Sequence, residues 1–444
     1  MRASRIARAR FFSWQTFYQP VRESVPASAA AVAACGAVSL AVMLHRDGSA
    51  VTLSRLDARL RPGLAIVLPH PIFVWLYSSS RSAFLSLLSH NVMSDVLDDS
   101  AFPHPLSVFG LRFRNDLGNA AGLDKDGRLL DFSYSMGAGF AVVGTVLNEP
   151  HCGNVFSMLG GLSLCNCWTP LPQSGGALNS LGLPSQGVDK AVENIAEFRR
   201  KHNIDLAVES SQCPLFRCFP IGVSIMGHPA REGQEQIDGV LECVKKAIPV
   251  ADFLEINESC PNVKHGGKPD DVLARLSLVV ALRDQIAVSE GRRVPILVKL
   301  GNIGDADTTV QVLSNLGVDG VVLVNTQKDH SSFDLPSRDQ KLLEYYTEKY
   351  GGGLSGRPIK ERALSQVATA VNAVQQQGVA GKFSVVHVGG IEDLEDMQRS
   401  RAVGADLRQW YTGLMHGLAH CDAPGELYRS VTEGAYRNDS RLVE

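Results

Sequence analysis

The feature that most constrains the fold of this chain is a regular alternation of short apolar runs with longer helix-like stretches between residues 117 and 412. The stretches between the runs, such as residues 188–202 and 361–377, carry the polar residues expected of an outer ring of helices. Eight such alternations predict a parallel sheet closed into an α/β barrel, the (β/α)8 TIM-barrel class. The eight runs are residues 117–120, 140–145, 219–224, 253–257, 294–300, 320–325, 383–388 and 407–412.

The composition fits one large domain with extensions. The 444 residues exceed the roughly 250 of a typical barrel, and 45% hydrophobic residues are sufficient for a core. A net charge of −3 gives no field that attracts nucleic acid, so small-molecule chemistry is expected. The nine scattered cysteines disfavour a disulfide framework. Cys165 with Cys167, and Cys213 with Cys218, lack the spacing of strong zinc motifs, so no metal site is predicted.

The first residues are typical of a mitochondrial transit peptide. Arginines precede the first acidic residue, Glu23, and alternate with aromatic residues. Residues 1–24 are therefore predicted to be a targeting segment. Residues 25–46 are predicted to be a transmembrane anchor, because residues 27–44 carry no charge and are just long enough to cross a bilayer. Together the two segments predict that the protein is located in the mitochondrial inner membrane. An apolar part of a longer presequence is the alternative.

Two further segments precede or interrupt the barrel, which is assigned to residues 101–430. Residues 56–100 contain apolar clusters broken by Pro62, Pro69 and Pro71. This pattern predicts short amphipathic helices that either lie on a membrane or pack against the main domain. Residues 150–183 are rich in Gly, Cys and Pro and are predicted to be an extended loop over the barrel mouth.

The strand ends supply candidate functional residues, because barrel active sites are built from the loops that follow the strands. Three turns, Ser355-Gly356, Gly389-Gly390 and Thr412-Gly413, allow main-chain N–H groups to approach a cofactor phosphate. Lys125 and Lys299 place positive charge in an apolar mouth, where each needs a partner such as a flavin carbonyl or a substrate carboxylate.

Asparagines and one cysteine complete the candidate set. Asn179, Asn257, Asn262 and Asn325 offer the paired donors and acceptors that suit a ring carrying amide groups, although single asparagines often serve as turn formers. Cys260 follows the fourth run among polar residues and is the group best placed to act as a base, if its surroundings favour the thiolate. A buried inert thiol is the alternative.

These stretches, above all residues 115–127 and 352–358, resemble the dihydroorotate dehydrogenases, and the resemblance extends from about residue 109 to residue 417. It implies an FMN-binding barrel that oxidises (S)-dihydroorotate to orotate in pyrimidine biosynthesis. The N-terminal extensions resemble those of the membrane-bound class, which passes electrons to ubiquinone. The resemblance gives Cys260 and Lys125 catalytic roles. It assigns substrate contacts to Lys125, Asn179, Leu183, Asn257, Asn262, Asn325 and Thr326. It assigns FMN contacts to Ala120, Ala121, Gly122, Lys125, Gly144, Thr145, Asn179, Ser224, Asn257, Lys299, Asn325, Ser355, Gly356, Gly389, Gly390, Tyr411 and Thr412.

Several positions depart from the family pattern. Cys260 stands where the membrane-bound class has a serine, and residues 259–264 resemble the soluble class, which leaves fumarate or NAD as alternative acceptors. Leu183 replaces a phenylalanine, Ser224 replaces an asparagine, and residues 150–178 lack the usual arginine. The eighth run carries Arg408 and Gln409 in place of more apolar residues. These departures keep two other functions open: a catalytically weakened barrel that binds flavin or orotate, and a phosphate-binding barrel enzyme without flavin.

Overall fold

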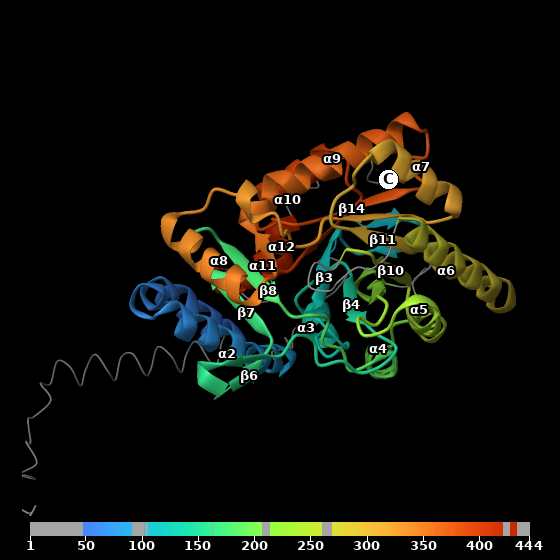
Figure 1. The fold of residues 1–444 in the computed structure, drawn as a ribbon. Helices are drawn as coiled ribbons and strands as arrows, with labels where there is room; N and C mark the ends of the chain where they lie inside the picture. Colours follow the sequence, from blue (N-terminus) through green and yellow to red (C-terminus); the bar gives the residue numbers. More distant parts are fainter. Residues whose placement is uncertain are drawn as a thin grey trace, which may run out of the picture. The chain divides into compact units, whose positions relative to one another are not determined.

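The computed structural model describes residues 48–90, 102, 105–161, 163–206, 214–259, 269–420 and 427–432. Eight parallel strands close into a barrel in the order β10-β11-β12-β14-β15-β3-β4-β9 (Figure 1), which confirms the predicted (β/α)8 fold. Each of the eight predicted runs coincides with one barrel strand. The strands are β3 (Leu117–Asp124), β4 (Ala141–Val146), β9 (Ile221–Ile225), β10 (Phe253–Asn257), β11 (Ile296–Leu300), β12 (Gly320–Leu323), β14 (Ser384–Val388) and β15 (Leu407–Trp410).

Amphipathic helices pack around the barrel. In α4 (Val188–His202), Val188, Ala191, Ile195 and Phe198 are buried, which is the three- and four-residue spacing of one helix face. The predicted helices 188–202 and 361–377 correspond to α4 and to α9 (Lys360–Gln376). The other described helices that follow β3 are α3 (Leu130–Ser135), α5 (Gly233–Ala247), α6 (Pro269–Glu290), α7 (Ala306–Leu316), α8 (Ser337–Tyr350), α10 (Leu394–Ala402), α11 (Thr412–His420) and α12 (Leu427–Thr432).

An apolar cluster fills the amino-terminal half of the barrel interior. The hairpin of β1 (Leu106–Val108) and β2 (Leu111–Phe113) contributes Phe113, whose ring centroid lies 5.5 Å from that of Phe140. Phe140 in turn lies 6.2 Å from Phe253. Glycine at position 222 makes room for this packing, because a Cβ there would lie 2.3 Å from the Phe253 ring. The polar end of the barrel interior is therefore the carboxyl end of the strands.

Residues 150–183 differ from the extended loop that the sequence predicts. They form two antiparallel hairpins, β5 (Phe156–Met158) with β6 (Ser163–Cys165), and β7 (Cys167–Leu171) with β8 (Gly176–Ser180). Strand β13 (Gly353–Gly356) pairs with β8, with Gly353 opposite Asn179. The prediction was wrong because partner strands supply the backbone hydrogen bonds of these short, Gly- and Pro-containing segments, and one partner is distant in sequence.

Two long helices precede the barrel. Residues 48–67 are helical through Pro62, so the predicted break at that proline was wrong, and α2 (His70–His90) begins after Pro69. Helix α2 contacts β7 (Figure 1) and buries Phe73 and Val74, which supports packing against the main domain. No helix within the described ranges is long and apolar enough to span a membrane. The predicted targeting segment 1–24 and anchor 25–46 lie outside the described residues.

Candidate active site

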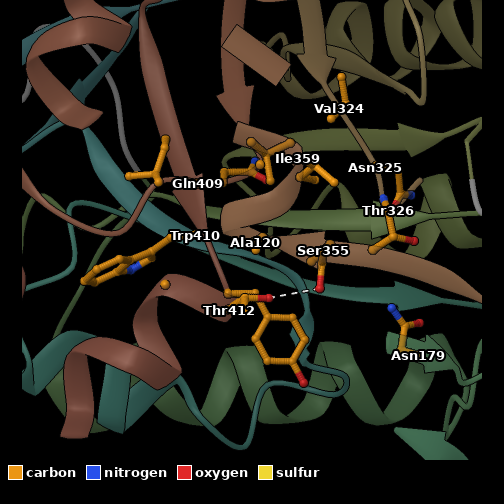
Figure 2. A pocket seen from close by; sticks show the side chains of 18 of the residues that line it. Ala120, Asn179, Val324, Asn325, Thr326, Ser355, Ile359, Gln409, Trp410 and Thr412 are labelled. Carbon is orange, nitrogen blue, oxygen red and sulfur yellow. Dashed lines mark hydrogen bonds between the residues drawn. The ribbon is translucent and has the colours of Figure 1, made fainter. Parts of the chain in front are cut away.

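Two adjoining cavities lie at the carboxyl ends of the barrel strands, and each has a volume of about 90 Å³. Cavity A reaches Gly356 before α9, the Gly389-Gly390 turn before α10, and Gly413 in the first turn of α11. Figure 2 shows Ser355 and Thr412, which lie next to two of these glycines. Cavity B extends to Gly122, Lys125 and Asn257. The two share a wall formed by Ala121, Asn179, Lys299, Asn325, Thr326 and Tyr411.

The glycine turns bring the backbone close to the neighbouring chain at the edge of cavity A. A Cβ on Gly413 would lie 1.9 Å from the Ile391 carbonyl oxygen, and one on Gly390 would lie 2.5 Å from Lys360 Cα, so neither position accepts a side chain without displacing backbone. The turns lead into helices whose first N–H groups have no partner within the helix. Such groups, next to a favourable helix dipole, are typical of anion sites.

Hydroxyl groups reinforce this edge of cavity A. The Ser355 and Thr412 hydroxyls lie 3.0 Å apart, as the dashed line in Figure 2 shows. The nearby cation Arg357 is hydrogen-bonded to Glu392 at 2.9 Å, and Lys360 pairs with Asp396 at 2.8 Å. With these two cations paired to carboxylates, main-chain N–H groups and the two hydroxyls are the donors best placed to receive a phosphate.

A series of hydrogen-bonded hydroxyl and amide groups links the strand ends at the wall of cavity B. Asn257 donates to the Thr145 hydroxyl at 2.9 Å and accepts from the Ser259 hydroxyl at 3.0 Å. Asn325 donates to the same Ser259 hydroxyl at 3.0 Å. These bonds fix the orientation of both amides, and each NH₂ group retains a second hydrogen for a ligand carbonyl.

Two lysines place positive charge at the walls of the cavities. Lys125 lines cavity B, and its Nζ is the atom that a Cβ on Gly122 would approach, at 3.8 Å. Lys299 lines both cavities, and its Nζ lies 3.6 Å from Glu255 Oε1 inside the barrel. Beside Lys125, burial and the charge of Asp126 raise the pKa of Asp124 to about 7.

A third and more apolar cavity, cavity C, has a volume of about 290 Å³ and is bounded by residues 48–67 and α2. Leu53, Phe84 and Met415 are among its apolar lining residues. Tyr411 borders all three cavities. The Arg81 guanidinium donates to the Tyr411 hydroxyl at 2.9 Å, so a polar pair lies between the barrel mouth and the apolar space.

The structure brings most of the predicted site residues to cavities A and B. Gly144 and Ser224 line neither cavity: Ser224 is buried behind Thr145, with 3.1 Å between the hydroxyls, and Gly144 packs against the Ser224 carbonyl. Cys260 and Asn262 lie outside the described residues. The predicted residues at the cavity walls are Ala120, Ala121, Gly122, Lys125, Thr145, Asn179, Leu183, Asn257, Lys299, Asn325, Thr326, Ser355, Gly356, Gly389, Gly390, Tyr411 and Thr412.

Several residues that lie at the cavities or orient their walls were not predicted from the sequence. Trp168 comes from β7, in the segment expected to be a loop, and Arg81 comes from α2. Ser259 stands beside Cys260 and could have been chosen on that ground. The two polar residues noted on the eighth run face opposite sides of β15: Arg408 is buried and bonds to Asp116, whereas Gln409 lines cavity A. No cluster of three metal-ligating side chains occurs among the described residues.

Comparison with known proteins gives one consistent family. Residues 105–423 match the family described as dihydroorotate dehydrogenase. The dihydroorotate dehydrogenase (quinone) of Stenotrophomonas maltophilia strain K279a is 32% identical over 319 residues, which covers 70% of this chain and 80% of that protein. The enzyme of the same name from Serratia proteamaculans strain 568 is 30% identical over 322 residues, covering 70% and 82%.

Solved structures support the fold. A crystal structure of DHODH from Eimeria tenella in complex with ferulenol has a TM-score of 0.61 and 22% sequence identity, and the match covers 80% of this chain and 89% of that one. The ligand-free structure from the same organism has a TM-score of 0.60 and 23% identity, covering 84% and 93%. At this identity the likeness concerns the barrel and its surrounding helices.

Proposed function

Because the chain belongs to the dihydroorotate dehydrogenase family, we propose that it binds FMN, oxidises (S)-dihydroorotate to orotate, and passes the electrons to a quinone. The observation that carries this proposal is the convergence of an anion-binding edge, fixed amides and two lysines on adjoining cavities A and B. A phosphate-binding barrel without flavin would account for the glycine turns but would give no role to Lys299 and to the oriented amides at the cavity walls.

The residues of cavity A suit FMN. The turns at Gly390 and Gly413, with the Ser355 and Thr412 hydroxyls, would receive the phosphate. Lys299 would face the pyrimidine end of the isoalloxazine ring, where reduction places negative charge. When bound, the flavin supplies a hydride acceptor in contact with the substrate.

The residues of cavity B suit an acidic dihydropyrimidine. Lys125 would bind the substrate carboxylate, and Asn257 and Asn325, already oriented through Ser259, would bind the ring amides. Cys260, the residue after Ser259, would take the proton from C5 as the C6 hydride leaves. The thiol of Cys260 then carries that proton until solvent accepts it.

Cavity C suits the quinone. Its apolar walls match a prenylated ring, and Tyr411 borders both cavity C and the FMN-side cavity A. The relatives named dihydroorotate dehydrogenase (quinone) favour this acceptor over fumarate and NAD, which Cys260 alone would permit. The exposed Leu60, Ile66 and Val67 on residues 48–67 leave an apolar surface at this end of the protein.

The composition of the N-terminal residues supports a proposed location in the mitochondrial inner membrane. Residues 1–24 would direct the chain to mitochondria, and residues 25–46 would anchor it in the inner membrane, where ubiquinone is dissolved. A fluorescent fusion of the full chain should co-localise with an inner-membrane marker. Deletion of residues 1–24 should abolish import.

The assignment of the base is tested by stopped-flow reduction of the bound flavin under anaerobic conditions. Cys260→Ala should retain FMN yet be reduced by dihydroorotate at least about a hundredfold more slowly, the scale of a lost general base. Cys260→Ser should be intermediate and should move the pH profile upward, since a hydroxyl is a weaker acid. An unchanged reduction rate in Cys260→Ala would remove Cys260 from the role.

The alternatives have separate outcomes. Protein that is yellow but is never reduced by dihydroorotate would be a flavin-binding barrel with weakened catalysis. Reduced enzyme that is reoxidised by fumarate or NAD and not by a soluble quinone would overturn the assignment of the acceptor.

A further inference from the structure

An acidic side chain lies inside the barrel where apolar residues are the rule. Side chains of β10 alternate, so Glu255 points to the same side as Phe253 in the apolar cluster and Asn257 in cavity B. Its exposed fraction is 0%. Barrel interiors are filled mainly by Val, Ile and Leu, and an isolated buried carboxylate is expensive. Glu255 therefore requires a partner that compensates its charge.

The partners of Glu255 belong to the cavity wall. Gln409, labelled in Figure 2, donates to Glu255 Oε2 at 3.1 Å. Oε1 accepts no hydrogen bond from any described residue and faces Lys299 Nζ at 3.6 Å. The interaction between Glu255 and Lys299 is thus one of charge rather than of close hydrogen bonding. The Lys299 ammonium keeps its hydrogens for cavities A and B, which it lines.

We propose that Glu255 is a positioning residue that tunes bound FMN through Lys299. The inference rests on the proposed function, because it concerns the flavin-side cavity. The Lys299 ammonium would stabilise the negative charge that two-electron reduction places on the flavin, and the Glu255 carboxylate on its far side offsets part of that effect. The pair therefore sets a flavin potential low enough for onward transfer to the acceptor in cavity C.

The charge balance between Glu255 and Lys299 would affect both half-reactions of the bound flavin. With an unbalanced Lys299 the flavin would take a hydride readily but would hold the electrons against a quinone. With Lys299 balanced by Glu255, reduction by dihydroorotate remains favourable while reoxidation is faster. A buried ion pair is weak evidence for stability, so a role in charge balance explains Glu255 better than a role in folding.

The test is the midpoint potential of bound flavin, measured by equilibration with a reference dye in the full-length FMN-loaded protein. Glu255→Gln keeps the shape and removes the charge, so the reduced form should be favoured at least about tenfold more than in the wild type, or about 30 mV for a two-electron couple. Lys299→Met should shift the potential in the opposite direction. In the Lys299→Met background, Glu255→Gln should have little effect, because Glu255 is proposed to act through the Lys299 ammonium.

A matched control directly follows the same strand. Glu258 lines neither cavity A nor cavity B and pairs with Arg275 of α6 at 2.5 Å, so Glu258→Gln should leave the potential unchanged. If Glu255→Gln does not fold, Gln409→Leu removes the hydrogen bond that stabilises the carboxylate and should shift the potential in the same direction by a smaller factor.

The outcomes separate this inference from the proposed function. A wild type that dihydroorotate reduces, with a Glu255→Gln variant of wild-type potential, would overturn the inference alone. A fall in melting temperature or FMN content without a change in potential would assign Glu255 a structural role and overturn it as well. A wild type that binds no FMN would instead refute the proposed function.

Discussion

Replacing Asp124 by asparagine should change how the stability of the protein depends on pH. Asp124 ends β3 with 2% of its side chain exposed, and it accepts hydrogen bonds from the Gly127 N–H at 2.8 Å and the Leu129 N–H at 3.0 Å. Burial, followed by the charge of Asp126, raises its pKa to about 7. The same carboxyl in the unfolded chain has a pKa of about 3.9.

The direction in which pH changes the stability follows from proton binding to Asp124. The folded protein holds this proton more tightly than the unfolded chain, so the stabilisation by Asp124 is complete below about pH 3.9 and is lost as pH rises through about 7. At about 1.4 kcal/mol for each pKa unit, the wild type should lose about 2.5 kcal/mol through this group between pH 5 and pH 8. An asparagine at position 124 does not titrate, so the variant should not lose this stability as pH rises.

Urea unfolding at constant ionic strength measures the difference. Asp124→Asn should be less stable than the wild type at pH 5, because its NH₂ group faces a backbone N–H from which the Asp124 carboxyl accepts a hydrogen bond. Between pH 5 and pH 8 its free energy of unfolding should rise by about 2 to 3 kcal/mol relative to that of the wild type. Asp305 is a suitable control: it is an exposed helix cap whose pKa is lowered by Thr308, so it titrates below this window. If the free energies of unfolding of wild type and Asp124→Asn depend on pH in the same way, Asp124 does not have a raised pKa in the folded protein.

Three further predictions concern the cavities. Gly413→Ala should yield protein with little bound FMN, because the new Cβ would lie 1.9 Å from the Ile391 carbonyl oxygen. Gly63→Ala, where a Cβ would have no neighbour within 4 Å, should retain FMN. The flavin released on denaturation measures the FMN content of both variants. Arg81→Met removes the partner of the Tyr411 hydroxyl and should slow reoxidation by quinone without slowing reduction by dihydroorotate; equal slowing of both half-reactions would contradict the assignment of cavity C. Lys125→Met should raise KM for dihydroorotate at least about tenfold, the effect of losing a charge-assisted hydrogen bond; an unchanged KM would contradict the assignment of Lys125 to the substrate carboxylate.

The barrel was predictable because its strands are buried on both faces and read as apolar runs. Phe253 and Leu254 at the start of β10, for example, are both fully buried, one inside the barrel and one against the helices. The strand ends then followed from the general position of barrel active sites. Most candidate residues could be placed at one mouth for this reason.

The remaining features depend on contacts between distant segments. Strand β13 pairs with β8 across more than 170 residues and brings Asn179 to the glycine turns. Trp168 and Arg81 reach the cavities from segments without a motif. Ser224 sits on the predicted strand, but its depth behind Thr145 depends on barrel geometry that a pattern does not contain. Local sequence cannot specify such tertiary pairings.

Anaerobic titration of the purified full-length protein with dihydroorotate examines the proposed cofactor and the proposed reaction together. The visible absorbance of bound FMN should be lost in proportion to the substrate added, with one orotate formed for each flavin reduced. A correctly folded barrel that binds no FMN, or whose flavin keeps its colour in excess dihydroorotate, would contradict the proposed function.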